Sequence, residues 1–486
     1  MMIAENIVAY VRDKEASYPP PPFSPGESYP EYPFKNIAAA PNHVYALVRE
    51  SFRRLGLDRT RFGTKEWNPL GELLRPGENV VVKPNWVYQE NRGHGSREAV
   101  TTHPSIVRAL LDYIWIALRG EGTVIVGDAP IQGCRLDKLL ENLNWHALPA
   151  FYAENGRMEV VLEDWRLEVY HGDAYVTFRK EVRPAGERFS VVDLGNYSAL
   201  EPVSNDHKNF RVTYYDPSKL LLHHRSGKHE YCVSRRVLEA DVIFNVSKLK
   251  SHRLAGITCC MKNLVGINGH KSFLPHFRQG SATEGHDEYP RPNILKALQS
   301  TFADRHTAAQ GRLSQFPYGL LRYSLLLLLK LAGMRIRYGA WHGNDTIWRT
   351  ILDLNRIVLY ADRQGFLQPS PQRRVFCLVD AVLAGEQEGP MRPKDRHCGV
   401  VIAGTNSLAV DTAAVKLLGF AMDLIPQIAE GFCLSSYPIY NETSAMISIA
   451  EVETLPLSEW APDIEPFLLP AGWRGIHREV TSLSSC

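Results

Sequence analysis

Short apolar runs alternate with amphipathic segments along much of the chain, and this alternation predicts the fold. The runs have the length and the β-branched content of buried strands. They occupy residues 79–83, 123–127, 241–246, 375–379 and 399–403. Apolar residues at helical spacing fill 42–57, 106–118 and 410–418. We therefore expect an α/β fold with a mostly parallel sheet flanked by helices.

Two stretches interrupt this pattern and predict insertions. Residues 156–222 hold many short β-prone runs, and residues 279–348 contain a leucine-rich helix. The proline-rich residues 18–34 suit an extended lead-in that packs through its aromatic rings. The expected segments are a lead-in (1–74), a first α/β part (75–155), a β-rich insertion (156–222), a second α/β part (223–278), a helical insertion (279–348) and a C-terminal α/β part (349–486).

Charge and cysteine content narrow the function classes. The chain has 55 basic and 53 acidic side chains spread along its length. Nucleic-acid binding would need a clustered basic face, so we expect no nucleic-acid partner. The N-terminus lacks the basic and apolar regions of a secretory signal, which favours a cytoplasmic protein. Eight cysteines without a CxxC pair favour buried thiols over a disulfide framework or an iron–sulfur cluster.

The most apolar stretch, Leu325–Leu329, lies between Arg322 and Lys330. It is too short to cross a bilayer, which takes about 18 uncharged apolar residues. The helix around it, residues 318–337, could pack on the core, on a second copy in a homo-oligomer, or on a membrane surface.

Unusual polar motifs follow four of the expected strands. They are Lys83-Pro84-Asn85, Gly127-Asp128-Ala129-Pro130, Lys248–His252 and Asp380–Pro390. In open α/β sheets ligands bind in the crevice outside the carboxyl ends of the strands. We therefore expect these motifs to share one site.

The segment Thr102-His103-Pro104 precedes an expected helix. Pro104 suits the first helical position, which places Thr102 or His103 at a helix end that favours anions. The alternative is a simple capping role. Asp411, near the start of the last helix, is expected to serve that helix's dipole.

The block 247–266 contains three lysines, an arginine and a histidine but no acidic residue. Its positive field could hold an anionic substrate or lower the pKa of a lysine enough to make the amine nucleophilic. The histidines at 252, 270 and 276 could act as bases or metal ligands, although their spacing is not that of a metal motif. Of Glu386 and Glu388, one could be an acid/base group and the other a solvated charge.

Six motifs resemble, in the same order, segments of the family called domain of unknown function 362. They are KPNWV, TTHP, VGDAP, DVIFNVSKLKSHRLAGITCCMKNLVG, GEQEGP and LAVDTAAVKLLGF, within residues 75–420. Many members look redox-associated because they carry a fused ferredoxin segment with CxxC repeats, which this chain lacks. The resemblance implies the α/β fold but no single activity.

A fainter resemblance is to lactate racemase of the nickel-pincer type. It would make His103 and His252 an acid/base pair, Lys262 the cofactor anchor and His276 a metal ligand. Two departures are Cys259-Cys260 in place of a pair of small residues, and the absence of an arginine between His103 and Pro104.

The leading hypothesis is a small-molecule enzyme that acts on an anionic substrate by His/Lys acid–base chemistry, as an isomerase does, with a divalent metal or a covalent cofactor as an option. The expected catalytic residues are His103, His252, Lys262 and Glu388, with His276 as metal ligand. The expected substrate-binding residues are Lys83, Asn85, Thr102, Asp128, Lys250 and Asn263. The alternative is a non-catalytic accessory protein that is redox-associated or lies on a membrane surface.

Overall fold

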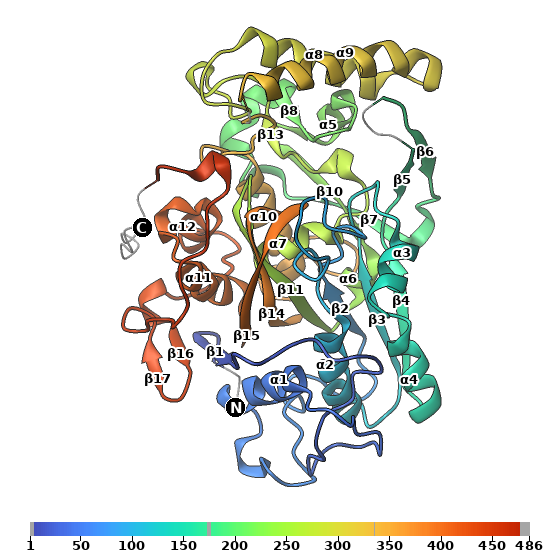
Figure 1. Cartoon of the computed structure of the whole chain (residues 1–486), viewed down its shortest axis with the longest axis vertical. Coiled ribbons are helices and arrows are strands. Elements are labelled where there is room, and N and C mark those ends of the chain that lie inside the picture. The colour runs from blue at the N-terminus through green and yellow to red at the C-terminus, as the bar shows by residue number, and fades with distance from the viewer. Residues whose placement is uncertain (1–3, 173–175, 335, 477–486) are drawn as a thin grey trace.

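The computed structural model describes residues 4–172, 176–334 and 336–476. One long sheet runs through the middle of the molecule (Figure 1). Its strands, in spatial order, are β17 (Thr454–Pro456), β16 (Ser448–Ala450), β1 (Ile7–Arg12), β15 (Arg392–Gly404), β14 (Arg374–Glu388), β11 (Val242–His252), β2 (Val80–Pro84), β3 (Thr123–Asp128) and β4 (Glu159–Asp164). Strand β12 (Gly256–Thr258) pairs with the end of β11.

The centre of the sheet is parallel and its other side is mixed. Strands β14, β11, β2, β3 and β4 run parallel to one another, whereas β15 is antiparallel to both β14 and β1. The predicted α/β class with a mostly parallel sheet is confirmed. Each of the five predicted strands corresponds to a strand of this sheet.

Side-chain alternation along the strands fills two separate cores. In β2, Val80 and Val82 enter one core while Val81 enters the other, as the two-residue period of a strand requires. The first core holds α1 (His43–Arg54), α2 (Pro104–Ala117), α3 (Leu136–Asn142) and α4 (Ala147–Asn155). The second holds α6 (Arg235–Glu239), α7 (Cys260–Asn263), α10 (Ile347–Tyr360), α11 (Ser407–Leu418) and α12 (Pro426–Phe432). Helices therefore cover both faces of the sheet.

Two strands run further than the sequence predicts. The segment Lys248–His252 continues β11 instead of following it, because it pairs with β12. The segment Asp380–Pro390 was also expected to follow its strand, but up to Glu388 it is the end of β14, which forms a long antiparallel hairpin with β15. Opposite charges face each other across this hairpin, in the pairs Glu386–Lys394 and Glu388–Arg392. The strand end was predicted too early because cross-strand pairing overrides the weak strand propensity of these residues.

The region between β3 and β11 is built from small sheets and turns, but it begins in the central sheet. Strand β4 pairs with β3 along its whole length, so the expected β-rich insertion starts only after residue 164. The remaining elements are β5 (Glu168–His171), β6 (Arg179–Val182), β7 (Phe189–Asp193), β8 (Phe210–Arg211), α5 (Pro217–His223), β9 (His224–Arg225) and β10 (Lys228–Ser234).

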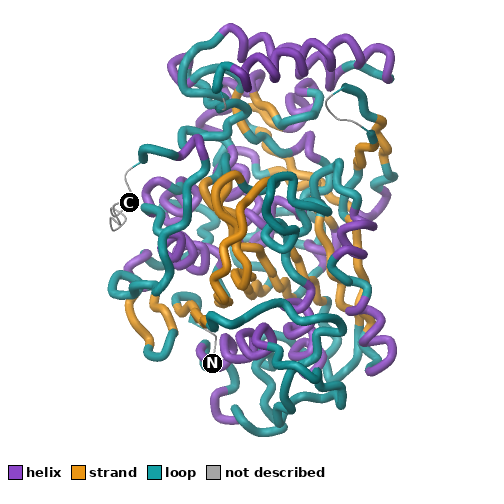
Figure 2. Tube along the Cα trace, viewed as in Figure 1, coloured by secondary structure: helices purple, strands orange, loops and turns teal. Residues whose placement is uncertain are grey.

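A helical hairpin forms one end of the molecule. Helices α8 (Ile294–Ala308) and α9 (Arg312–Leu331) lie side by side at the top of Figure 1, beyond β13 (Phe277–Arg278) and β8. Figure 2 shows the strands gathered in the middle of the molecule, with this helical pair at one extreme. Among the described residues, no helix has both the length and the apolar character needed to cross a bilayer.

Candidate functional site

The carboxyl ends of β2 and β3 bring Lys83 and Asp128 together. The Lys83 Nζ lies 2.9 Å from Asp128 Oδ1, and both side chains are almost fully buried. The Lys83 Nζ also donates to Asn263 Oδ1 at 3.0 Å. Burial lowers the pKa of Lys83, and the neighbouring carboxylate opposes this effect. The pair has little room around it, because a Cβ on Gly266 would lie 1.9 Å from Asp128 Oδ1.

Asn263 extends this contact to Asn85, Lys250 and Thr102. The Asn85 Nδ2 donates to Asn263 Oδ1 at 3.0 Å, and Lys250 Nζ donates to Asn85 Oδ1 at 2.6 Å. The backbone N–H of Asn85 donates to Thr102 Oγ1 at 2.9 Å. All six residues predicted to bind substrate therefore belong to one buried hydrogen-bond network, which we call the lysine network. Whether they bind a substrate stays a prediction.

His103 lies in a neighbouring cluster. It caps α2, with Pro104 as the first helical residue, as expected. Its backbone N–H donates to Asp380 Oδ2 at 2.9 Å, and Asp380 also pairs with Lys248 at 3.1 Å. Tyr18, from the proline-rich lead-in, stacks on the His103 ring with 4.0 Å between ring centroids.

Sequence reasoning placed His103, Lys248 and Asp380 at the expected site but missed Tyr18. The Tyr18 hydroxyl donates to Asp380 Oδ1 and accepts from Lys248 Nζ, each at 2.7 Å. Phe23 covers another side of the His103 ring, edge-on at 5.7 Å. The lead-in thus encloses the ring of His103, and the cluster meets the lysine network at Thr102, the neighbour of His103 in the chain. The sequence did contain one indication of this grouping. Lys248, Lys250 and His252 alternate along β11, so their side chains lie on the same face of the strand.

His252 is buried and uses one ring nitrogen on the backbone. Its Nδ1 accepts the N–H groups of Leu254 and Ala255, both at 3.1 Å. Burial and the charge of Lys262 hold the pKa of His252 well below its usual range. A neutral ring with Nδ1 as acceptor carries its proton on Nε2. The free nitrogen of His252 is therefore a hydrogen-bond donor.

His276 has the opposite arrangement. Its Nδ1 lies 2.7 Å from the carbonyl of Leu274 and must donate to it, which leaves a lone pair on Nε2. Burial lowers the pKa of His276 to about 3, so the ring is neutral at physiological pH. A metal-bound histidine commonly has this arrangement. Within the described ranges, however, His276 is not one of three converging ligand residues, and we derive no step through a metal.

Lys262, on α7, has an amine with an unusually low pKa. Burial and the charges of Lys271 and Lys83 lower the pKa of Lys262 to about 7. Burial also lowers the pKa of Lys271 to about 8, and its Nζ donates to the Ala129 carbonyl at 3.3 Å. Both side chains are half-buried, so solvent can reach them. In the described part of the chain, no carboxylate forms an ion pair with Lys250, Lys262 or Lys271. Asp128 is thus the one ion-paired carboxylate in a group of four lysines.

Asp411 holds α7 in place. Its carboxylate accepts the N–H of Cys260 at 2.7 Å and of Met261 at 3.0 Å, at the start of the helix that carries Lys262. The expectation that Asp411 serves the dipole of its own helix was wrong, because Asp411 lies beyond the first turn of α11. Among the described residues, one group of three side chains could together offer ligand atoms to a metal ion, and it consists of Asp411, Cys259 and Cys260.

The carboxylates of Glu386 and Glu388 have their hydrogen-bond partners outside the lysine network. The Glu388 Oε1 accepts the N–H of Ala471 at 2.7 Å, and its Oε2 lies 4.0 Å from Arg253 Nε. The Glu386 Oε2 accepts the N–H of Leu468 at 3.0 Å, and its side chain is buried. Neither carboxylate is a freely solvated charge, and both fasten the C-terminal segment to the β14–β15 hairpin.

A large cavity of about 870 Å³ lies at the opposite edge of the sheet, near the amino ends of β11 and β14. Two of the arginines that line it have partners. Arg374 binds Glu78 at 2.7 Å, and Arg373 donates to backbone carbonyls including that of Leu238 at 2.9 Å. The size of this cavity favours it as the functional site, whereas the positive charge without paired carboxylates favours the region of the lysine network. We choose the lysine network as the candidate site because a buried charge is costly unless it has a partner.

Comparison with known proteins shows a family for this chain. The model of the family described as Domain of unknown function (DUF362) matches residues 80–196 and 196–416. This chain belongs to the DUF362 family. The matched DUF362 ranges include the whole lysine network as well as His103, His252, Lys262 and His276. Tyr18 lies outside them. The resemblance to lactate racemase is not supported by any match.

Other matches are few. No curated protein matches the chain. A crystal structure of a Thermotoga maritima protein is 12% identical, with a TM-score of 0.31, over 75% of this chain and 57% of that one. This DUF362 chain therefore spans little more than half of that protein, and so distant a likeness supports no inference.

Replacing Gly266 should disturb the lysine network. We expect Gly266→Ala to lower the free energy of unfolding by about 1–3 kcal/mol, because the added methyl group collides with Asp128. Gly133→Ala is the control, since no atom lies within 4 Å of its added Cβ. Urea denaturation measures both, and equal stability of the two variants would contradict the packing described here.

The amine of Lys262 should titrate near neutrality. Below pH 7 the amine is mostly protonated and unreactive, and above pH 7 it is mostly neutral and reactive. An ordinary lysine titrates at about pH 10.4. We expect acetylation of Lys262, followed by peptide mass spectrometry, to reach half its maximal rate at about pH 7. Lys65, which is 82% exposed, is the internal reference. The same pH curve for both lysines would show that Lys262 is not perturbed.

Proposed function

We propose that this protein is a small-molecule enzyme that binds an anionic substrate beside Lys262. The observation that carries the proposal is the excess of lysine over carboxylate in the network around Asp128. Lysines desolvated without partners either lose their protons or gain an anion. A carboxylate or phosphate would fit both the charge and the half-buried position of Lys262 and Lys271.

The reaction proposed is removal and return of a proton next to the anionic group, as an isomerase performs. At physiological pH a large fraction of Lys262 is neutral, so its Nζ can accept the proton from a substrate carbon. The Nε2–H of neutral His252 can donate a hydrogen bond to a substrate oxygen on which negative charge develops. The proton then returns from Lys262 to the substrate.

This assignment differs from the sequence-based hypothesis in two roles. His103 and His252 were expected to form an acid/base pair, but the Nδ1 of each accepts a backbone N–H. We therefore assign the base to Lys262 and a donor role to His252. His103 is proposed to position Thr102 and the start of α2, and Glu388 to anchor the C-terminal segment rather than react.

Anion binding should be accompanied by proton uptake. The proposed reaction needs Lys262 to be neutral in the complex, so we assign the charge that matches the anion to Lys271, whose pKa is about 8. At pH 8 about half of Lys271 is neutral, and a bound anion raises its pKa, so protons are taken up as the complex forms. We expect titration calorimetry with phosphate or lactate, in two buffers of different ionisation enthalpy, to show uptake of up to about half a proton by Lys271.

The variant Lys271→Met should weaken binding by at least about tenfold, which corresponds to about 1.4 kcal/mol. Lys65→Met removes an exposed lysine and is the control. Absence of binding for both anions, or equal binding by Lys271→Met and the native protein, would refute the proposal.

A further inference from the structure

Helix α9 turns its polar side toward the protein and its apolar side toward solvent. Its buried residues are Gln315, Gly319, Arg322 and Leu329. Its exposed large apolar residues are Leu313, Phe316, Leu320, Leu321, Tyr323, Leu327, Leu328 and Leu331. Surface helices normally bury their apolar stripe. The orientation of α9 is therefore the reverse of that expected for a helix in contact with water.

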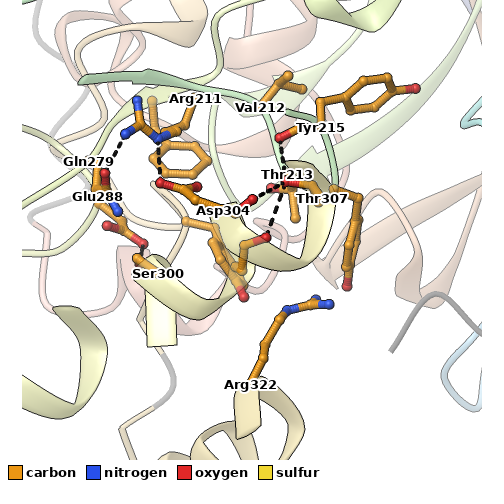
Figure 3. Close-up of a pocket in the computed structure, with 14 residues that line it drawn as sticks. Arg211, Val212, Thr213, Tyr215, Gln279, Glu288, Ser300, Asp304, Thr307 and Arg322 are labelled. Atoms are coloured by element: carbon orange, nitrogen blue, oxygen red, sulfur yellow. Dashed lines mark hydrogen bonds and ion pairs between the residues drawn. The ribbon is translucent and has the colours of Figure 1, made fainter. Parts of the chain in front are cut away.

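The side of the hairpin that faces the rest of the protein makes polar contacts. Figure 3 shows Arg211 reaching Asp304 of α8, with the two side chains 3.1 Å apart. Thr307 donates to the carbonyl of Tyr215 at 2.9 Å, and Arg322 points into the same region (Figure 3). The cavity that remains there is about 20 Å³, room for about one water molecule. On α9 itself, Gln315 Oε1 accepts the N–H of Phe178 at 3.2 Å, and the Arg322 guanidinium lies 4.7 Å from the centre of the Tyr214 ring. These contacts turn the polar side of α9 toward the protein and leave its apolar side outward.

Helix α8 enlarges the exposed surface. Ile294 is 77% exposed and Leu298 is 43% exposed. Together α8 and α9 contribute ten of the 21 large apolar side chains that are exposed among the described residues. We call these ten residues of 294–331 the hairpin face. Apolar patches of this kind mark an interaction surface.

Exposed basic residues accompany the hairpin face. Among the described residues between 291 and 337, Arg291, Arg305, Arg312 and Lys330 are exposed, while Asp304, the one acidic residue there, is paired with Arg211. The whole chain, by contrast, is almost balanced at 55 basic and 53 acidic side chains. Arg312 and Lys330 stand near the two ends of α9, and both are exposed. A partner must therefore be apolar at its centre and negatively charged around it.

We propose that the hairpin face binds the surface of a membrane that contains anionic phospholipid. The leucine side chains would enter the outer acyl region, and Arg312 and Lys330 would remain beside the phosphate groups. A second copy of the chain is a poorer partner, because a two-fold interface would place the same basic residues against each other. The position of the hairpin at one end of the molecule suits contact with a flat surface (Figure 1).

The hairpin is joined to the rim of the candidate site. The carbonyl of Arg211 accepts the N–H of His276 at 2.8 Å, while its guanidinium holds Asp304 of α8. Membrane contact would thus place the His276 side of the site near the bilayer. The proposal does not depend on the proposed function, since it rests on the exposed face of α8 and α9.

Vesicle sedimentation tests the proposal. The full chain is mixed with vesicles of equal parts phosphatidylcholine and phosphatidylglycerol, and with vesicles of phosphatidylcholine alone. We expect the chain to pellet with the anionic vesicles and to bind neutral ones at least about tenfold more weakly. The variant Leu320→Glu/Leu327→Glu should lose at least about tenfold in partition to anionic vesicles.

The matched control is Phe366→Glu/Val452→Glu, which places two glutamates at apolar positions that are 70% and 91% exposed elsewhere. It should bind anionic vesicles as the native chain does. The proposal is overturned if the native chain stays in the supernatant, or if the hairpin variant pellets equally well. It is also overturned if sedimentation velocity shows a native dimer that the hairpin variant converts to monomer, because a second copy then covers the face.

Discussion

The ion pair between Lys83 and Asp128 is the contact on which the candidate site depends. It joins the ends of two neighbouring parallel strands, and Asn263 ties it to α7. Three further lysines lie in the same group without a carboxylate of their own among the described residues. Burying protonated amines without carboxylates costs free energy, unless the amines lose their protons or bind an anion. The rest of the site, including the lowered pKa of Lys262, follows from that imbalance.

Much of the site could be predicted from the sequence because parallel strands end at the same edge of a sheet. Lys83, Asp128 and Lys250 were chosen as residues at or near strand ends, and the structure places them in one network. Helix α1 and the capped start of α2 were also predictable, since the apolar spacing and Pro104 depend on local sequence. These features need no knowledge of distant contacts.

The features of the site that could not be predicted depend on contacts between distant segments of the chain. Tyr18 reaches Lys248 across 230 positions of sequence, and no local pattern indicates that pairing. Asp411 was predicted to act on its own helix, but tertiary packing places it at the start of α7. The roles of His252 and His276 depend on which ring nitrogen meets the backbone, and that is visible only in three dimensions.

The orientation of helix α9 also depends on contacts with distant segments. The leucine-rich sequence predicted helix α9 but left open which side would face the body. That choice is made by contacts such as those of Gln315 with the backbone of Phe178 and of Arg322 with the ring of Tyr214, whose partners lie more than a hundred residues earlier in the chain. The protein therefore combines a basic site at the sheet edge with an apolar surface on the helices attached to it.

The central claim is that Lys262 and Lys271, beside the lysine network, hold an anion, and anomalous diffraction from crystals soaked in bromide tests it most directly. The account predicts a bromide ion in contact with the Nζ of Lys262 or Lys271. Bromide bound elsewhere on the molecule, with none beside either amine, would contradict it.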